Sequence, residues 1–233
     1  ERNHDVDIFC LQEVFNGNEA GFFREDRRIN GFTEISNRLP HHIGYFANTE
    51  ELDDTPPSGM AIPYGVAIFA KKDIEVLSYH QDFVFGTDKF ASEDAKTHKR
   101  AIQSINILHN NKKLAISNVH GLWNGQGKTD TPERISQSNK IKAHITSFDC
   151  PVILAGDFNL LPDTESLSII SNGMRDLIKE YSITSTRSSL YTKHANPVLF
   201  ADYIFTSPEI NINNFEVMVD VVSDHLPVVL DFN

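Results

Sequence analysis

Cysteine is scarce in this chain, and it has neither a long apolar run nor an excess of basic charge. Two cysteines among 233 residues, Cys10 and Cys150, are too few for a disulfide framework and cannot form a four-ligand zinc site on their own. No run of about 18 apolar residues occurs, which excludes a membrane-spanning helix. These features favour a cytoplasmic location. The chain begins at Glu1 with neither a methionine nor an apolar leader, so the sequence does not exclude a targeting segment upstream of Glu1.

The charge balance is acidic. Asp and Glu number 32 against 21 Lys and Arg, which gives a formal net charge of -11 and a pI near 5.3. Such a surface repels polyanions at neutral pH, so tight nonspecific binding of duplex DNA by a broad basic face is not expected. An enzyme that gathers carboxylates around a divalent cation remains compatible, because such a site needs acidic groups whatever its substrate.

Eight apolar runs rich in β-branched and aromatic residues predict strands along the whole chain. They are Val6–Leu11, Gly65–Ala70, Ala101–Leu108, Lys113–Val119, Val152–Ala155, Ala201–Phe205, Glu216–Val222 and Val228–Phe232. Some, such as Val152–Ala155, are continuously apolar, which predicts burial on both faces. The pattern therefore favours one layered α/β domain over residues 1–233.

Helices are predicted in two clear places. Thr131 offers a cap, with a proline at the first helical position, and this helix should end before Pro151. A second, short helix should start at Asp163 or Thr164 and end near Gly173. Residues 22–28 suggest a charged helix, and polar loops are expected at 48–59 and 85–99.

Polar groups suited to a metal or a phosphate follow directly on several predicted strands. The segments are Ile8–Glu13, Ser117–His120, Leu154–Asn159 and Val222–His225, with Asp202 as a fifth candidate. Acids and histidines at strand ends converge when the strands are neighbours in a sheet, and Mg²⁺ requires oxygen ligands held in this way. Each segment alone also has an ordinary explanation, such as a turn or a cap at the end of a strand.

Taken together and in order, these motifs resemble the endonuclease/exonuclease/phosphatase superfamily, which includes DNase I-like nucleases, deadenylases, inositol polyphosphate 5-phosphatases and sphingomyelinases. The residues that carry the resemblance are Leu11-Gln12-Glu13-Val14, Val119-His120, Gly156-Asp157-Phe158-Asn159, Ala201-Asp202-Tyr203-Ile204-Phe205 and Ser223-Asp224-His225-Leu226-Pro227-Val228. The resemblance implies a four-layer α/β sandwich, with two packed, mainly antiparallel β-sheets flanked by helices. It also implies that the family's first strand and helix, roughly 20 residues, would lie before Glu1.

The resemblance further implies the roles of seven residues. Glu13 would bind Mg²⁺ or Mn²⁺ with help from Asp224. His225 would activate water or stabilise the attacked phosphoryl group, with Asp202 accepting a hydrogen bond from its ring. The remaining roles are orientation of the nucleophile and phosphate by Asp157 and Asn159, and contact of His120 with a phosphate oxygen or the leaving group. These roles fit the chemistry of an anionic phosphodiester, whose hydrolysis needs neutralised charge and an oriented water.

Substrate contacts are predicted on the loop that follows His120 and at the start of one strand. Trp123 could stack a base or a ring, and Asn124 lies beside it. Lys128 or Arg134 could bind a phosphate, and Arg100 could face the same cleft. The ordinary alternatives are a packing role for His120 and Trp123, and a solvated loop around Arg100.

The sequence thus predicts a monomeric, metal-dependent phosphoesterase that hydrolyses phosphodiesters, foremost in nucleic acids or nucleotides. An inositol-phosphate phosphatase or a sphingomyelinase-like phospholipase is the enzymatic alternative, because the same residues serve those substrates. A catalytically inactive relative that binds a partner is the third hypothesis, favoured by the apparent lack of the opening strand.

Overall fold

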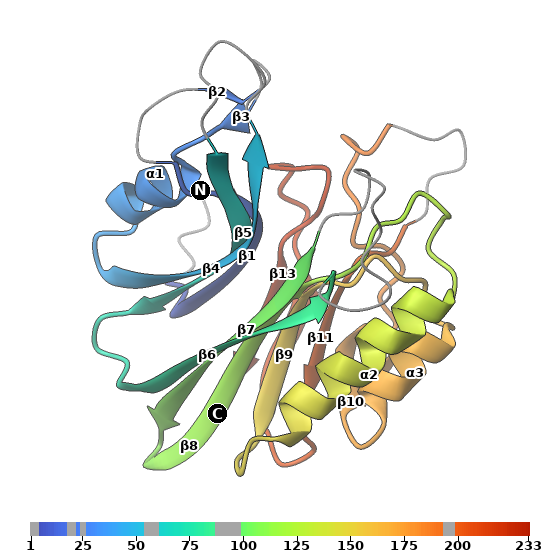
Figure 1. The fold of residues 1–233 in the computed structure, drawn as a ribbon. Coiled ribbons are helices and arrows are strands. Elements are labelled where there is room, and N and C mark those ends of the chain that lie inside the picture. The colour runs from blue at the N-terminus through green and yellow to red at the C-terminus, as the bar shows by residue number, and fades with distance from the viewer. Residues whose placement is uncertain (1–4, 18–21, 24–26, 54–60, 87–98, 193–198) are drawn as a thin grey trace.

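Two β-sheets face each other in the computed structural model, which describes residues 5–17, 22–23, 27–53, 61–86, 99–192 and 199–233. Helix α1 (Gly31–Arg38) lies outside one sheet, and α2 (Pro132–Thr146) and α3 (Glu165–Ser171) lie outside the other (Figure 1). This order of helix, sheet, sheet and helix confirms the predicted four-layer α/β sandwich.

The larger sheet has six strands in the order β10-β11-β9-β8-β7-β6. Their bounds are Val76–Phe85 for β6, Arg100–His109 for β7, Lys112–His120 for β8, Val152–Asp157 for β9, Arg175–Asp176 for β10 and Asp202–Thr206 for β11. Strands β8 and β9 are parallel and are joined through α2, whereas the other neighbours in this sheet are antiparallel. Helix α4 (Leu177–Glu180) follows β10 directly.

The facing sheet is antiparallel, in the order β1-β5-β4. Its strands are β1 (Ile8–Phe15), β5 (Ala61–Lys71) and β4 (His42–Asp53). Two further antiparallel pairs are described, β12 (Ile212–Val217) with β13 (Val228–Phe232), and β2 (Phe22–Phe23) with β3 (Arg27–Arg28). Within the described ranges no helix is both long and apolar enough to cross a membrane.

The main apolar core lies between the sheets and under α2 and α3. Ile68 of β5 and Ile105 of β7 are buried in the part of this core between the sheets, and Ile141 of α2 packs on the other face of the larger sheet. Asn118 of β8 forms a polar link within this core, because its Nδ2 donates to the carbonyls of Leu11 and Ala67 in the facing sheet. The sheets are thus held by apolar burial and by hydrogen bonds that fix their mutual position.

Both predicted helices begin where the sequence places them. Thr131 is the N-cap of α2 and accepts a hydrogen bond from the backbone of Arg134, and Pro132 is the first helical residue. Thr164 caps α3 in the same way. Strand β9 is buried on both faces, as its apolar run predicts.

A buried hydrogen-bond chain attaches α2 to the larger sheet. His144 Nδ1 lies 2.6 Å from Asp82 Oδ2, and His144 Nε2 lies 2.8 Å from Ser104 Oγ, which in turn lies 2.7 Å from Ser117 Oγ. These four residues form the α2 hydrogen-bond chain. Its serines are fully buried and its Asp82 end is exposed, and the chain has the geometry of a structural clamp between α2 and the sheet.

Three expectations about local structure are wrong. Residues 48–53 belong to β4, an edge strand whose open side tolerates polar side chains, and not to a loop. Residues 22–23 and 27–28 pair as short strands instead of forming a helix. The strand expected at Glu216–Val222 is β12, which ends at Val217, and Val219 and Val222 beyond it are exposed. The remainder of the two expected loops, 54–60 and 87–98, lies outside the described residues.

Candidate functional site

Three neighbouring strands of the larger sheet bring acidic and imidazole side chains to one edge. His120 ends β8 and Asp157 ends β9, and the parallel register places these two residues side by side. Asp202 begins the antiparallel strand β11 opposite Asp157. The carboxyl ends of β8 and β9 therefore meet the amino end of β11, as expected from the motifs at these strand ends.

The backbone beyond β9 is shaped by a close approach to β8. A Cβ atom on Gly121 would lie 2.2 Å from the carbonyl oxygen of Phe158, so only glycine fits there. Asn159 adopts a left-handed φ of 53°, and its N–H donates to Asp157 Oδ1 over 2.8 Å. This turn holds the Asp157 carboxylate at the sheet edge and places Asn159 next to it, with Asn159 Nδ2 3.4 Å from the Gly121 carbonyl.

His225 joins this edge from the loop between β12 and β13. Its Nδ1 lies 2.8 Å from Asp202 Oδ2, and its Nε2 lies 3.8 Å from Asp157 Oδ2. His120 Nε2 is also 3.8 Å from Asp157 Oδ2. The predicted Asp202–His225 pair is thus present, and Asp157 lies between the two histidines.

Burial and charge shift the protonation equilibria of this cluster. Burial raises the pKa of Asp157 to about 6, and the neighbouring Asp202 carboxylate adds to the shift. Burial alone would lower the pKa of His225, but the hydrogen bond and charge of Asp202 outweigh it and raise this pKa above its ordinary value. A histidine with this environment can accept a proton from water and hold it.

The donor set of the cluster fits a divalent cation. Asp157, Asp202 and His225 each offer one ligand atom, and these atoms all lie within 4.8 Å of one another. Two carboxylates and one imidazole suit Mn²⁺, and carboxylate oxygens suit Mg²⁺. The residues present therefore fit the metal that the motifs imply.

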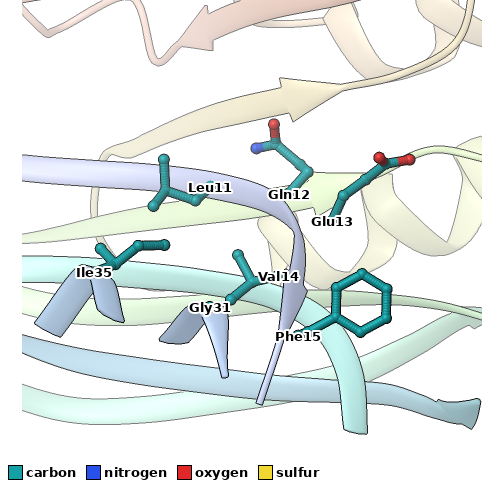
Figure 2. A pocket seen from close by; sticks show the side chains of 7 residues that line it. All are labelled: Leu11, Gln12, Glu13, Val14, Phe15, Gly31 and Ile35. Atoms are coloured by element: carbon teal, nitrogen blue, oxygen red, sulfur yellow. The ribbon is translucent and has the colours of Figure 1, made fainter. Parts of the chain in front are cut away.

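Glu13 lies on β1, at an irregularity in the pairing with β5 between Leu11 and Val14. Its φ is 57°, a left-handed conformation that turns the strand locally. Gln12 is anchored to the larger sheet, because its Nε2 donates to Asn118 Oδ1 over 2.7 Å. In Figure 2 the Gln12 and Glu13 side chains extend away from α1, at the rim of a cavity of about 390 Å³.

Glu13 is not a member of the Asp157–Asp202–His225 group, the group of possible ligands found among the described residues. Its side chain is exposed, so a cation from solvent has access to its carboxylate. The metal-binding role of Glu13 stays a prediction.

Asp224 is paired with an arginine that the sequence motifs did not single out. Arg187 Nη1 lies 3.1 Å from Asp224 Oδ2 and also forms a hydrogen bond with His225 Nε2. Main-chain pairing holds the two segments together, because Leu226 N–H donates to the Thr186 carbonyl over 2.9 Å. No local pattern around Arg187 announces this contact, since it is made 37 residues away in the sequence.

Lys128 is a second buried cation near the cluster. Its Nζ donates to the Phe200 carbonyl over 2.9 Å, and burial lowers its pKa to about 8, against the opposing attraction of Asp157. The sequence indicated Lys128 only as one of two possible phosphate ligands on its loop.

The predicted substrate-binding residues differ in their surroundings. Arg134 is buried and donates to the carbonyls of the loop before α2, at Gly127 and Thr129, so its visible contacts organise that loop. Asn124 accepts a hydrogen bond from Gln126 N–H in the same loop. None of these contacts tests the predicted binding roles.

Trp123 and Arg100 differ in exposure. Trp123 is 37% exposed, which agrees with the alternative of a partial packing role and leaves part of its ring accessible, whereas Arg100 is buried. Arg100 begins β7, and the β7–β8 register continues from Val119 toward the end of β8, which brings Arg100 beside that edge. Its Nε and Nη1 are buried with no hydrogen-bond partner among the described residues.

Comparisons with known proteins agree with this architecture. The sequence model of the Endonuclease/Exonuclease/phosphatase family matches residues 2–225. A UPF0294 protein of Photorhabdus laumondii is 33% identical over 135 residues, which cover 58% of this chain and 48% of that protein. The CCR4-Not complex 3'-5'-exoribonuclease subunit Ccr4 of Aspergillus niger is 21% identical over 204 residues, covering 74% of this chain and 30% of that protein. The chain thus spans half or less of these relatives.

Solved structures share the fold over nearly the whole chain. A mannosyl-6-phosphatase of Bacteroides thetaiotaomicron superposes with a TM-score of 0.73 at 18% identity, covering 99% of this chain and 86% of that one. TDP2 of D. rerio, in complex with a single-stranded DNA product, superposes with a TM-score of 0.66 at 17% identity, covering 97% and 86%. At these identities the likeness establishes the fold alone.

Proposed function

The chain belongs to the endonuclease/exonuclease/phosphatase family, whose members act as phosphoesterases, and from this premise we propose that it hydrolyses phosphodiester bonds with the help of Mg²⁺ or Mn²⁺. Nucleic acids or nucleotides are the proposed substrates. The observation that carries the proposal is the Asp202–His225 pair, 2.8 Å apart, beside the buried Asp157 at one sheet edge.

In this proposal His225 removes a proton from the attacking water. Asp202 accepts a hydrogen bond from the Nδ1–H group, which fixes the tautomer and favours the imidazolium that forms. Asp157 and Asn159 orient the water and the phosphate, because their turn fixes both side chains at the same edge. His120, on the other side of Asp157, lies where it can contact a phosphate oxygen or the leaving group.

Glu13 and Asp224 are the proposed metal ligands, and the Asp157–Asp202–His225 group, whose donor atoms lie close together, supports a cation at this sheet edge. The cation would neutralise phosphate charge as a Lewis acid. Arg100 and Arg134 are proposed to bind a substrate phosphate, and Trp123 and Asn124 are proposed to contact the substrate beyond it. Trp123 has the exposed ring needed to stack on a base.

The test compares hydrolysis of an aryl phosphodiester with that of an aryl phosphomonoester, with Mg²⁺ or Mn²⁺ and with chelator. His225→Ala should reduce diester turnover by about 10²- to 10⁴-fold, because the general base is lost. Glu13→Gln should weaken Mn²⁺ binding measured by calorimetry. His109→Ala is the control, because His109 is a half-buried histidine at the end of β7 far from the site.

Chelator-sensitive diester cleavage that falls in His225→Ala supports the proposal, and oligonucleotides are then the next substrates. Preference for the monoester supports the alternative of an inositol-phosphate or similar phosphatase. Metal binding without turnover of either ester contradicts the enzymatic proposal and supports a binding protein.

A lipid phosphodiester is the second candidate, because apolar side chains are exposed on loops beside the site. Val219 and Val222, on the segment that leads to Asp224, are each 77% exposed, and Leu190 and Leu199 flank the Arg187 segment. Such residues suit the apolar part of an amphiphile. Turnover of a short-chain phosphocholine lipid that rises above its micelle concentration, and that a Val219→Ser, Val222→Ser variant loses, would favour this substrate over nucleic acid.

A further inference from the structure

Arg187 is a buried cation in direct contact with the proposed catalytic histidine. Its side chain is 6% exposed, and its guanidinium lies 4.2 Å from the centre of the Tyr191 ring. Nη1 bridges Asp224 Oδ2 and His225 Nε2. Nε is buried without a hydrogen-bond partner among the described residues, so the guanidinium has an unused donor.

The contact determines which nitrogen of His225 carries the proton. A guanidinium only donates hydrogen bonds, so His225 Nε2 must be the acceptor. The proton therefore sits on Nδ1, and this N–H donates a hydrogen bond to Asp202. Asp202 and Arg187 together hold the ring from both nitrogens, in the tautomer that a base needs.

The same contact places Arg187 next to the reacting atoms. Any water or phosphoryl oxygen that binds His225 Nε2 must take the position of the Arg187 N–H or lie beside it. A phosphoryl oxygen at that position would take the place of His225 Nε2 as an acceptor for the guanidinium, and it would carry more negative charge. Planar guanidinium groups bind phosphate strongly.

We propose that Arg187 is a further catalytic residue of this site, whose guanidinium binds the phosphoryl group under attack. The inference rests on the proposed phosphoesterase function and adds a residue to it. Before substrate arrives, Arg187 holds His225 and Asp224 in place. On binding, it donates to a phosphoryl oxygen and supports the charge that develops there.

The side chain of Arg187 can be changed without removing the main-chain contacts of its segment. Ser188 N–H donates to the Asp224 carbonyl, and Leu226 N–H donates to the Thr186 carbonyl. These backbone hydrogen bonds keep the two segments paired in any variant at position 187. A loss of function in such a variant therefore reports on the guanidinium.

The test measures inorganic phosphate binding by calorimetry in the presence of Mg²⁺, and separately the kcat and KM of the best diester substrate. Arg187→Gln should weaken phosphate binding about tenfold or more and lower kcat about 100-fold, and Arg187→Lys should fall between it and the wild type. In Arg187→Ala, guanidinium chloride at millimolar concentration should restore part of kcat, whereas methylammonium should not. Arg175→Gln is the control, since it also removes an arginine–carboxylate pair, here with Glu180 on the surface.

Unchanged phosphate affinity and kcat in Arg187→Gln, in a wild type that does turn over diesters, would overturn the assignment of Arg187 and leave the proposed function intact. A lower kcat with unchanged phosphate affinity and no rescue by guanidinium would also overturn it, in favour of a positioning role. A wild type without turnover would contradict the proposed function, and the phosphate titration would still decide whether Arg187 binds the anion.

Discussion

Replacing Asp157 by asparagine should make the metal-free protein more stable at neutral pH while abolishing its activity. Asp157 is buried next to Asp202, and both burial and this neighbour raise its pKa from 3.8 to about 6. Asparagine keeps the shape of the side chain, and its Oδ1 can still accept the hydrogen bond of the Asn159 N–H. The substitution removes the buried negative charge but not the turn.

The size of the effect follows from proton linkage. Between pH 3.8 and about 6 the folded protein retains a proton that the unfolded chain has released, so stability falls as the pH rises through this window. A pKa difference of this size corresponds to about 3 kcal/mol in the free energy of unfolding. For a chain of this length that is on the order of 5–10 °C in melting temperature.

The assay is thermal unfolding of wild type and Asp157→Asn from pH 4 to pH 8 in chelator, with Asp149→Asn as the control at an exposed carboxylate. The two melting temperatures should be similar near pH 4, separate between pH 4 and 6, and stay apart above that range. A variant that is less stable than the wild type at pH 7.5, or a difference that does not change with pH, would refute the argument from burial.

Further predictions concern the base, the backbone and the α2 hydrogen-bond chain. Asp202→Asn should lower the pKa of His225, so the acidic limb of the profile of kcat/KM against pH should move to lower pH while kcat falls about 100-fold. Gly121→Ala should place a Cβ 2.2 Å from the Phe158 carbonyl and should lower the melting temperature and the activity together. His144→Ala should reduce the free energy of unfolding by about 1–3 kcal/mol in urea titrations, because the buried Ser104 loses a hydrogen-bond partner, with KM unchanged.

Much of the fold was predictable because its strands and helices carry strong local signals. The apolar run at Val152–Ala155 and the cap at Thr131 each predict an element that the structure confirms. Strand β4 was only partly predictable. Its polar residues 48–53 pair along β5, and that pairing depends on a partner strand and not on local hydrophobicity. The short pair β2–β3 has the same origin.

The residues of the candidate site were also predictable only in part. Asp157, Asp202 and His225 follow apolar strands or precede one, so their convergence could be inferred from strand order. Arg187 lies in a loop whose course is fixed by backbone pairing, and no local pattern places it near the cluster. Lys128 was indicated only as one of two possible phosphate ligands on the loop after His120, and its burial beside the acids could not be read from the sequence. The cations of the site were therefore harder to predict than its acids.

Buried acids and a buried lysine lie together at the sheet edge, which indicates that this region is arranged to bind a ligand and not to stabilise the fold. The apolar core and the hydrogen bonds of Asn118 account for the packing of the two sheets, and neither requires Asp157 and Asp202 to lie side by side. Their mutual repulsion and burial raise the pKa of Asp157 to about 6, and the burial of Lys128 lowers its pKa to about 8. Burial thus disfavours the charged forms of both Asp157 and Lys128. Binding of a metal cation by the acids and of an anionic phosphate by the lysine would offset both costs at the same place. The acidic surface as a whole need not repel such a substrate, because Lys128 and Arg187 supply the positive charge where the phosphate would bind.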